Sequence, residues 1–184
     1  VSGIPFWQRL LDQGYRLTGI GGSDNHDARI GATEPGRNRI GSPTTVVYAR
    51  NLSAGAIADG LRSGQVFIDV QGGTHRLLEL SARTRSAVAH MGGELRLGEG
   101  EEAQIAVRVT DVPGGVIEII RDGVKLEGVG STRIGTADHE VVFTERGDGR
   151  RHWLRVDVRD AQGRLVLVGN PIYFNREADS GKAP

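Results

Sequence analysis

The sequence predicts two successive regions, an α/β region and then an all-β region. Helix-like and strand-like patterns alternate as far as Gln71-Gly72-Gly73, and the residues after it read as short strands separated by turns. That glycine pair marks a plausible boundary. We therefore predict an α/β domain over residues 1–73, an antiparallel β-sandwich over 74–174 and a disordered tail over 175–184, where apolar residues become scarce.

The first predicted element is a helix that begins near Pro5 and ends at Gly14. Proline suits an early helical position, and glycine is a common helix terminator. Apolar residues recur at helical spacing between them, namely Phe6, Trp7, Leu10 and Leu11. The apolar run Leu17–Ile20 predicts a strand directly after this helix.

A strand, a helix and a second strand are predicted next. Residues 44–49 are rich in β-branched and aromatic side chains. Ser53 is a suitable N-cap for a helix that would end at Gly64, and a further strand would follow at Val66–Val70. Because strand-helix-strand units form parallel pairs, this order predicts an α/β layer.

Alternation of apolar and polar residues dominates the second region. Residues 105–109 and 154–158 both alternate, which predicts strands with one buried face and one face in water. Asp122-Gly123 is a hairpin signal, and Gly147-Asp148-Gly149 and Gln162-Gly163 mark later turns. Short strands with such turns are typical of a β-sandwich.

Composition narrows the possible partners. Acidic and basic residues balance to a net charge of zero and are interspersed, which argues against nucleic acid or a membrane surface as a partner. No apolar run is long enough to span a membrane, so we expect a soluble protein, cytoplasmic or periplasmic. The chain has no cysteine, so a metal would have to use His, Asp, Glu or water.

The tetrad Ser23-Asp24-Asn25-His26 is the strongest chemical signal in the chain. Residues two apart in extended chain project to the same side, so Asp24 and His26 can face one point in space. A carboxylate and an imidazole aimed together suit a divalent cation. The other interpretation is a turn, because Ser, Asp and Asn side chains also bond to nearby backbone amides.

Three spaced blocks carry a resemblance to a known family: residues 16–27, which include the tetrad, residues 41–49 and residues 60–68. In this order they resemble the C-terminal part of the PHP-superfamily metal-dependent hydrolases, in the CehA/McbA-like branch. The closing run 169–174 is similar to the end of that branch as well. The resemblance covers the chain from Ile4 to Phe174.

This resemblance implies a fold and an activity. The fold would be the C-terminal portion of a distorted PHP-type β/α barrel, followed by the β-sandwich. Asp24 and His26 would be the last ligand pair for divalent Zn, Mn or Fe, and metal-activated water would cleave an ester or phosphoester bond of a small-molecule substrate. The family's earlier His and Glu ligands have no counterpart here, and the other histidines of this chain do not match those motifs.

Two ligands are too few to hold a catalytic metal, so we expect the chain alone to be inactive or nearly so. It begins at Val1 without a methionine, and we interpret it as a fragment of a larger hydrolase. Unpaired barrel edges would favour association with the missing N-terminal half or with a second copy. The alternative is a noncatalytic β-sandwich module for binding or oligomerisation.

Four further residues are weaker candidates. Arg29, Arg37 and Arg39 lie in a glycine- and proline-bearing stretch without periodicity, and could bind an anionic substrate through paired hydrogen bonds. Solvated loop arginines are the commoner case. Asp27 could accept a hydrogen bond from the second ring nitrogen of His26, as partners of metal-ligating histidines do, or could equally cap a turn.

Overall fold

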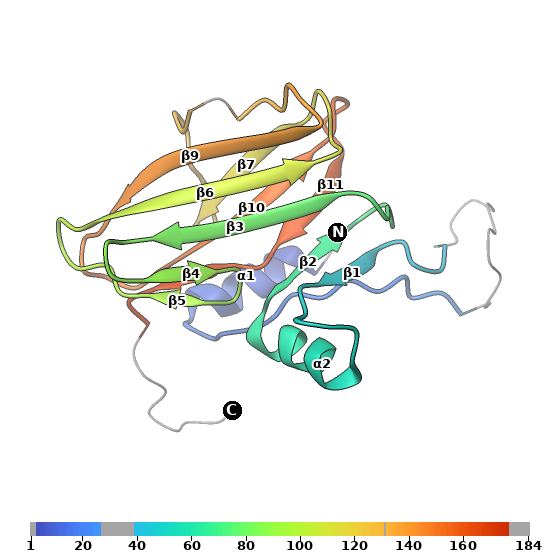
Figure 1. Ribbon diagram of the computed structural model, residues 1–184, viewed down its shortest axis with the longest axis horizontal. Helices are drawn as coiled ribbons and strands as arrows, with labels where there is room; N and C mark the ends of the chain where they lie inside the picture. Colours follow the sequence, from blue (N-terminus) through green and yellow to red (C-terminus); the bar gives the residue numbers. More distant parts are fainter. Residues whose placement is uncertain (1–2, 27–38, 131, 177–184) are drawn as a thin grey trace.

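Two antiparallel sheets dominate the computed structural model, which describes residues 3–26, 39–130 and 132–176 (Figure 1). The helices and strands are α1 (Ile4–Asp12), β1 (Thr44–Val47), α2 (Ala54–Ser63), β2 (Val66–Asp69), β3 (Leu77–Arg83), β4 (Val88–His90), β5 (Glu94–Leu95), β6 (Glu102–Thr110), β7 (Val116–Arg121), β8 (Val124–Lys125), β9 (Asp138–Arg146), β10 (His152–Arg159), β11 (Leu165–Gly169) and β12 (Ile172–Phe174). Neither helix is long and apolar enough to cross a membrane, within the part of the chain described.

The larger sheet is built around β10. One edge of β10 pairs with β7, and the other pairs with β11 along one part and β12 along another. The neighbour order continues from β11 through β2 to β1, and from β12 to β5. Only the β12–β5 pair in this sheet is parallel among the described strands. The smaller sheet has the order β4-β3-β6-β9 and is antiparallel throughout.

One hydrophobic core lies between the two sheets. Leu78 and Ile105 enter it from the smaller sheet, and Leu154 and Ile119 enter it from the larger sheet. Phe67 of β2 belongs to the same cluster and is completely buried. Strand β2 therefore belongs to this core, and a buried aromatic side chain such as Phe67 contributes strongly to its stability.

The predicted portion of a distorted PHP-type β/α barrel is therefore wrong. The described residues form two antiparallel sheets and two short helices, and no barrel is closed among them. The predicted parallel strand-helix-strand unit is wrong as well, because β1 and β2 pair antiparallel. Helix α2 leaves and returns at the same end of the pair, so the N–H of Tyr48 donates to the carbonyl of Gln65 at 2.9 Å.

Local signals performed better than the fold class. Helix α1 lies where the helical spacing predicted it. Ser53 caps α2 by accepting a hydrogen bond from the Ala56 N–H, and Gly64 ends α2 in a left-handed conformation. Asp122 and Gly123 both have positive φ and connect β7 to β8 as a hairpin. No strand forms at Leu17–Ile20, where the chain follows an irregular path.

The predicted wet face of β10 is also wrong. Leu154, Val156 and Val158 are buried as expected, but Arg155 and Asp157 on the opposite face are only 1% and 5% exposed. The ring of Trp7 of α1 packs against the Arg155 guanidinium, with 5.5 Å between the ring centre and Arg155 Cζ. Arg155 also forms an ion pair with Asp157. Helix α1 covers the outer face of the sheet here, so a polar pattern does not mean exposure at this strand.

The predicted division at residue 73 is not decided by the strand pairs. Strand β2 lies before that point and β11 lies after it, and the two pair over three residues. Residues 177–184 of the predicted tail lie outside the described residues, whereas Asn175 is well anchored. Its side chain accepts a hydrogen bond from the Leu97 N–H at 2.8 Å and donates to the Leu97 carbonyl at 2.7 Å.

Candidate functional site

The segment between α1 and the tetrad is held in place by side chains. The hydroxyl of Thr18 donates to the Leu61 carbonyl at 3.0 Å. Further along, Thr45 Oγ1 accepts a hydrogen bond from the Gly21 N–H at 2.9 Å and contacts the Gly21 carbonyl oxygen at 2.8 Å. These contacts fix the backbone that leads to the tetrad, although no strand ladder forms.

Close packing around this segment leaves room only for glycine at positions 19 and 21. A Cβ on Gly21 would lie 2.6 Å from Ile68 Cγ2, and one on Gly19 would lie 3.0 Å from the ring of Trp7. Contacts under about 3.4 Å are repulsive for carbon atoms, so any side chain here would push the segment away from β2 or α1. Gly19 and Gly21 therefore permit this segment to pack closely against Trp7 and Ile68.

Asp24 and His26 converge at the end of this segment. Asp24 Oδ1 and His26 Nε2 are 3.0 Å apart, and their side chains are 88% and 81% exposed. Asp24 adopts φ of +51°, so the backbone is not extended as predicted from the spacing. Aspartate tolerates this left-handed conformation better than most residues, and the turn brings both side chains together by another path.

Asp24 Oδ1 and His26 Nε2 form a direct hydrogen bond, because their separation of 3.0 Å lies in the hydrogen-bonding range. Two ligands held at right angles about 2.1 Å from a six-coordinate ion would stand about 3.0 Å apart, whereas two ligands of a tetrahedral zinc ion would stand about 3.4 Å apart. One carboxylate and one imidazole make a hard-to-borderline donor set that suits Zn, Mn or Fe. Nevertheless, no three His, Asp or Glu side chains in the described residues come together as a metal-binding group.

The weaker candidates receive little support. Arg39 is exposed, and its carbonyl accepts a hydrogen bond from the Ser42 N–H in the turn before β1. The described residues show no contact between Arg39 and either Asp24 or His26. Asp27, Arg29 and Arg37 lie outside the described residues, so their proposed roles stay predictions.

His152 lies in a carboxylate cluster that the sequence did not reveal. Its Nδ1 lies 2.5 Å from Asp122 Oδ2, and its Nε2 lies 2.9 Å from Asp148 Oδ1. The backbone N–H of Arg150, followed by the His152 ring, holds the pKa of Asp148 below its ordinary value of 3.8. Since its two ring nitrogens face carboxylates of different turns, His152 links those two turns.

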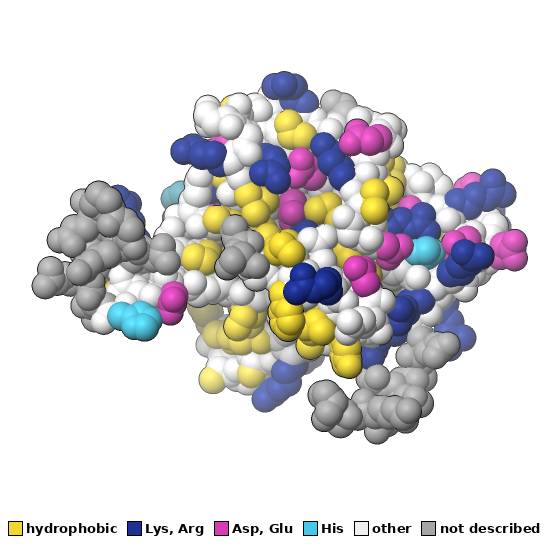
Figure 2. Space-filling model, turned by 180° about the vertical axis from the view of Figure 1, so that it is seen from behind, with side chains coloured by type: hydrophobic (Ala, Val, Ile, Leu, Met, Phe, Trp, Pro, Cys, Tyr) yellow, Lys and Arg dark blue, Asp and Glu magenta, His cyan; other side chains and the backbone are white. Residues whose placement is uncertain are grey.

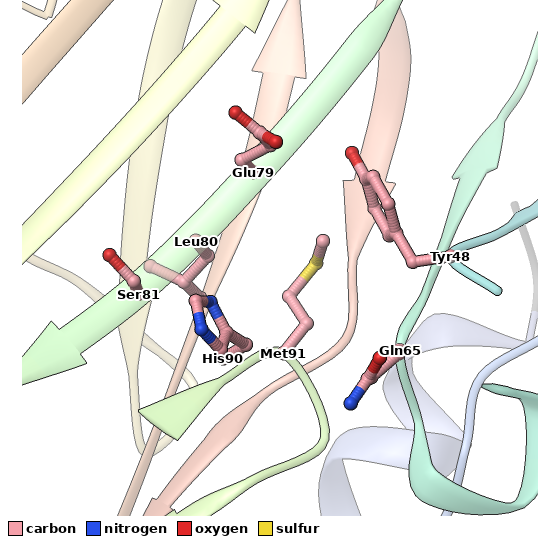
Figure 3. A pocket seen from close by; sticks show the side chains of 7 residues that line it. All are labelled: Tyr48, Gln65, Glu79, Leu80, Ser81, His90 and Met91. Atoms are coloured by element: carbon pink, nitrogen blue, oxygen red, sulfur yellow. The ribbon is translucent and has the colours of Figure 1, made fainter. Parts of the chain in front are cut away.

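A cavity of about 360 Å³ opens beside β3 and β4 (Figure 3). Its lining residues are Tyr48, Gln65, Glu79, Leu80, Ser81, His90 and Met91. The Tyr48 hydroxyl donates to the Leu78 carbonyl at 2.9 Å, and burial, followed by the charge of Glu79, raises the pKa of Tyr48 to about 12. Tyr48 is therefore a neutral hydrogen-bonding group and not a nucleophile.

The surface around α1 carries exposed apolar side chains. Phe6 is 58% exposed on α1, and Ile20 is 66% exposed on the segment before the tetrad. Seen from behind, hydrophobic side chains gather in the middle of the molecule, with charged side chains around them (Figure 2). Isolated exposed apolar residues are common, but a gathered group favours contact with another surface.

No family model matches this chain, and no curated protein matches it either.

Proposed function

We propose that this chain is part of a metal-dependent hydrolase, in which Asp24 and His26 supply two ligands of a divalent cation. The supporting observation is the separation of 3.0 Å between Asp24 Oδ1 and His26 Nε2 on two exposed side chains. The proposal depends on this donor pair and on the resemblance of residues 16–27 to a hydrolase motif. It does not depend on a β/α barrel.

The chemistry follows from the ligand types. A bound divalent cation would lower the pKa of a coordinated water, which could then cleave an ester or phosphoester bond. Asp24 would contribute negative charge and His26 a neutral nitrogen donor. Thr45 and Gly21 fix the backbone three residues before Asp24, which limits the positions that the two donors can reach.

The remaining ligands would come from outside the described residues. A catalytic site of this kind needs about three protein ligands and one open position for water. Asp24 and His26 supply two, and their exposure leaves them accessible to ligands from another chain or from a longer form of this protein. The chain alone is therefore expected to bind metal weakly and to hydrolyse substrates poorly.

Equilibrium dialysis with Mn²⁺ or Zn²⁺ tests the site directly. Asp24→Ala and His26→Ala should each lower metal binding by roughly ten-fold or more, because one of only two ligands is lost. Asp59→Ala and His75→Ala are matched controls, since Asp59 is exposed on α2 and His75 is exposed before β3. Both controls should bind metal like the wild-type chain.

Two outcomes would contradict the proposal. Metal binding that survives in both Asp24→Ala and His26→Ala would remove the pair from the site. Rapid turnover of generic phosphoesters or carboxyl esters by the chain alone, unchanged in those variants, would place catalysis elsewhere in the molecule.

A further inference from the structure

Strand β9 is a long edge strand of the smaller sheet. It pairs with β6 over nine consecutive residue pairs without a register shift, and no other described strand lies on its second side. Edges are commonly protected by bulges, prolines or lysines. Strand β9 has no bulge, proline or lysine, and its edge is regular over nine residues. Charged residues such as Glu140 and the buried Glu145 are its remaining edge-protecting features.

The direction of the backbone groups on β9 can be assigned from its flanking hydrogen bonds. The Asp111 N–H donates to the Ala137 carbonyl at 2.8 Å, and the Gly147 N–H donates to the Glu101 carbonyl at 2.8 Å. The backbone N–H and C=O groups of the odd-numbered residues of β9 therefore point toward β6. Those of the even-numbered residues point away from β6, to the free side of the strand. Within the described residues, the N–H and carbonyl groups of Glu140, Val142 and Thr144 have no partner on this outer side.

We propose that β9 pairs antiparallel with β9 of a second copy of this chain, with Val142 opposite Val142 of that copy. In this register each outward-facing residue meets an outward-facing residue, because Glu140 lies opposite Thr144. The two Val142 residues exchange both of their backbone hydrogen bonds, as a two-fold symmetric antiparallel pair allows. The two smaller sheets join into one continuous sheet.

Charge complementarity selects this register. It places Asp138 opposite Arg146 at both ends of the pair, and apolar Val142 at its centre. Asp138 also accepts two hydrogen bonds from Arg108 of β6, and 56% of its side chain is exposed. Opposite charges directly across an antiparallel pair are favourable, and like charges are unfavourable. Arg146 makes no ion pair within the described part of the chain, so it is available for this contact.

The neighbouring registers are poorer. Centring the pair on Val141 places Asp138 opposite Thr144 and Glu140 opposite Val142, so no opposite charges meet. Centring it on Phe143 retains Glu140 opposite Arg146 but shortens the pair and places Val141 opposite Glu145. The register centred on Val142 uses all nine residues of the strand.

Sedimentation of the full chain at increasing concentration tests the association. The wild-type chain should form a dimer, and Arg146→Asp should weaken the dimer by about ten-fold, because two symmetric attractive pairs become repulsive. Arg83→Asp is the matched control, since it makes the same charge change on an exposed residue of β3. It should leave the dimer unchanged. A monomeric wild-type chain, or equal effects of the two variants, would refute the proposal.

A cysteine substitution tests the register. The chain contains no cysteine, so Val142→Cys introduces a single thiol opposite its own copy, within the Cα separation of about 5.5 Å that a disulfide accepts. Mild oxidation should cross-link this variant much faster than Val88→Cys, whose parent residue is 42% exposed on β4, compared with 47% for Val142. Equal cross-linking rates would overturn the register. The test is independent of Asp24 and His26.

Discussion

The side-chain amide of Asn170 is hydrogen-bonded to both backbone polar groups of Gly19. Its Oδ1 accepts from the Gly19 N–H at 2.7 Å, and its Nδ2 donates to the Gly19 carbonyl at 2.9 Å. The same Nδ2 donates to the Val66 carbonyl at 2.8 Å. Asn170 is 1% exposed, so a buried side chain near the end of the chain joins the segment before the tetrad to β2.

Replacing Asn170 should therefore destabilise the protein. We expect Asn170→Ala to lower the free energy of unfolding by about 2–4 kcal/mol, because three backbone groups lose their partner in a buried place. Urea unfolding measures this difference. Asn51→Ala, at an exposed turn residue, should change it by less than about 0.5 kcal/mol. Equal effects of the two substitutions would show that the Asn170 contacts contribute nothing.

Replacing two glycines of α2 by alanine should have opposite effects on the stability of the protein. A Cβ on Gly55 meets nothing within 4 Å, so Gly55→Ala should stabilise the protein by up to about 1 kcal/mol through helix propensity. A Cβ on Gly60 would lie 2.6 Å from the Tyr48 carbonyl oxygen and from Val47 Cγ1, so Gly60→Ala should destabilise the protein. Thermal unfolding of both variants checks the sign. A stabilising Gly60→Ala would mean that α2 does not pack closely on β1.

Truncating Phe67 tests whether residues 1–73 and 74–174 share one core. Phe67→Ala should lower the free energy of unfolding by about 3–5 kcal/mol, whereas Phe67→Leu should cost less. Far-UV circular dichroism and tryptophan fluorescence should report one coincident transition, because Trp153 packs with Leu11 of α1 in a second apolar cluster. Two separate transitions would instead favour the division at residue 73.

Asp148 and Glu145 should give opposite dependences of stability on pH. The pKa of Asp148 is lowered from 3.8, so its contribution to stability is complete above that value and is lost as pH falls through the folded pKa. Burial raises the pKa of Glu145 above 4.5, against the opposing charge of Arg121. Its contribution is complete below 4.5 and is lost as pH rises through the folded pKa.

Urea unfolding of Asp148→Asn and Glu145→Gln at a series of acid pH values checks these signs. Asp148→Asn should reduce the loss of stability on the acid side, and Glu145→Gln should reduce the loss as pH rises. The slopes are compared and not the absolute stabilities, because Glu145→Gln also weakens the ion pair with Arg121. Identical slopes in both variants and the wild-type chain would contradict the assignments.

Local structure could be predicted because it depends on neighbouring residues. The Ser53 cap, the Gly64 helix end and the Asp122-Gly123 hairpin all use short-range geometry. The direction of β2 relative to β1 could not be read from the order of elements, since the same order permits a helix that returns to the end where it left. The burial of Arg155 depends on Trp7, which is distant in sequence and packs over it.

The candidate site was predicted only in part. The spacing of Asp24 and His26 correctly indicated that their side chains could meet, but the backbone path differs because Asp24 has positive φ. The sequence assigned Thr45 to strand geometry alone, although its hydroxyl also contacts Gly21. His152 gave no signal, because its partners Asp122 and Asp148 belong to separate turns.

The segment before the tetrad is fastened by individual side chains and not by a strand ladder, and this makes binding and folding interdependent. If an ion on Asp24 and His26 favours the fastened state, then by thermodynamic reciprocity the contacts that fasten the segment must strengthen ion affinity by the same factor. Asn170, which touches no donor atom, would thus act as a remote determinant of how tightly the cation is held. Removing the hydrogen bonds between Asn170 and Gly19 would then lower the affinity for a cation as well as the stability of the fold.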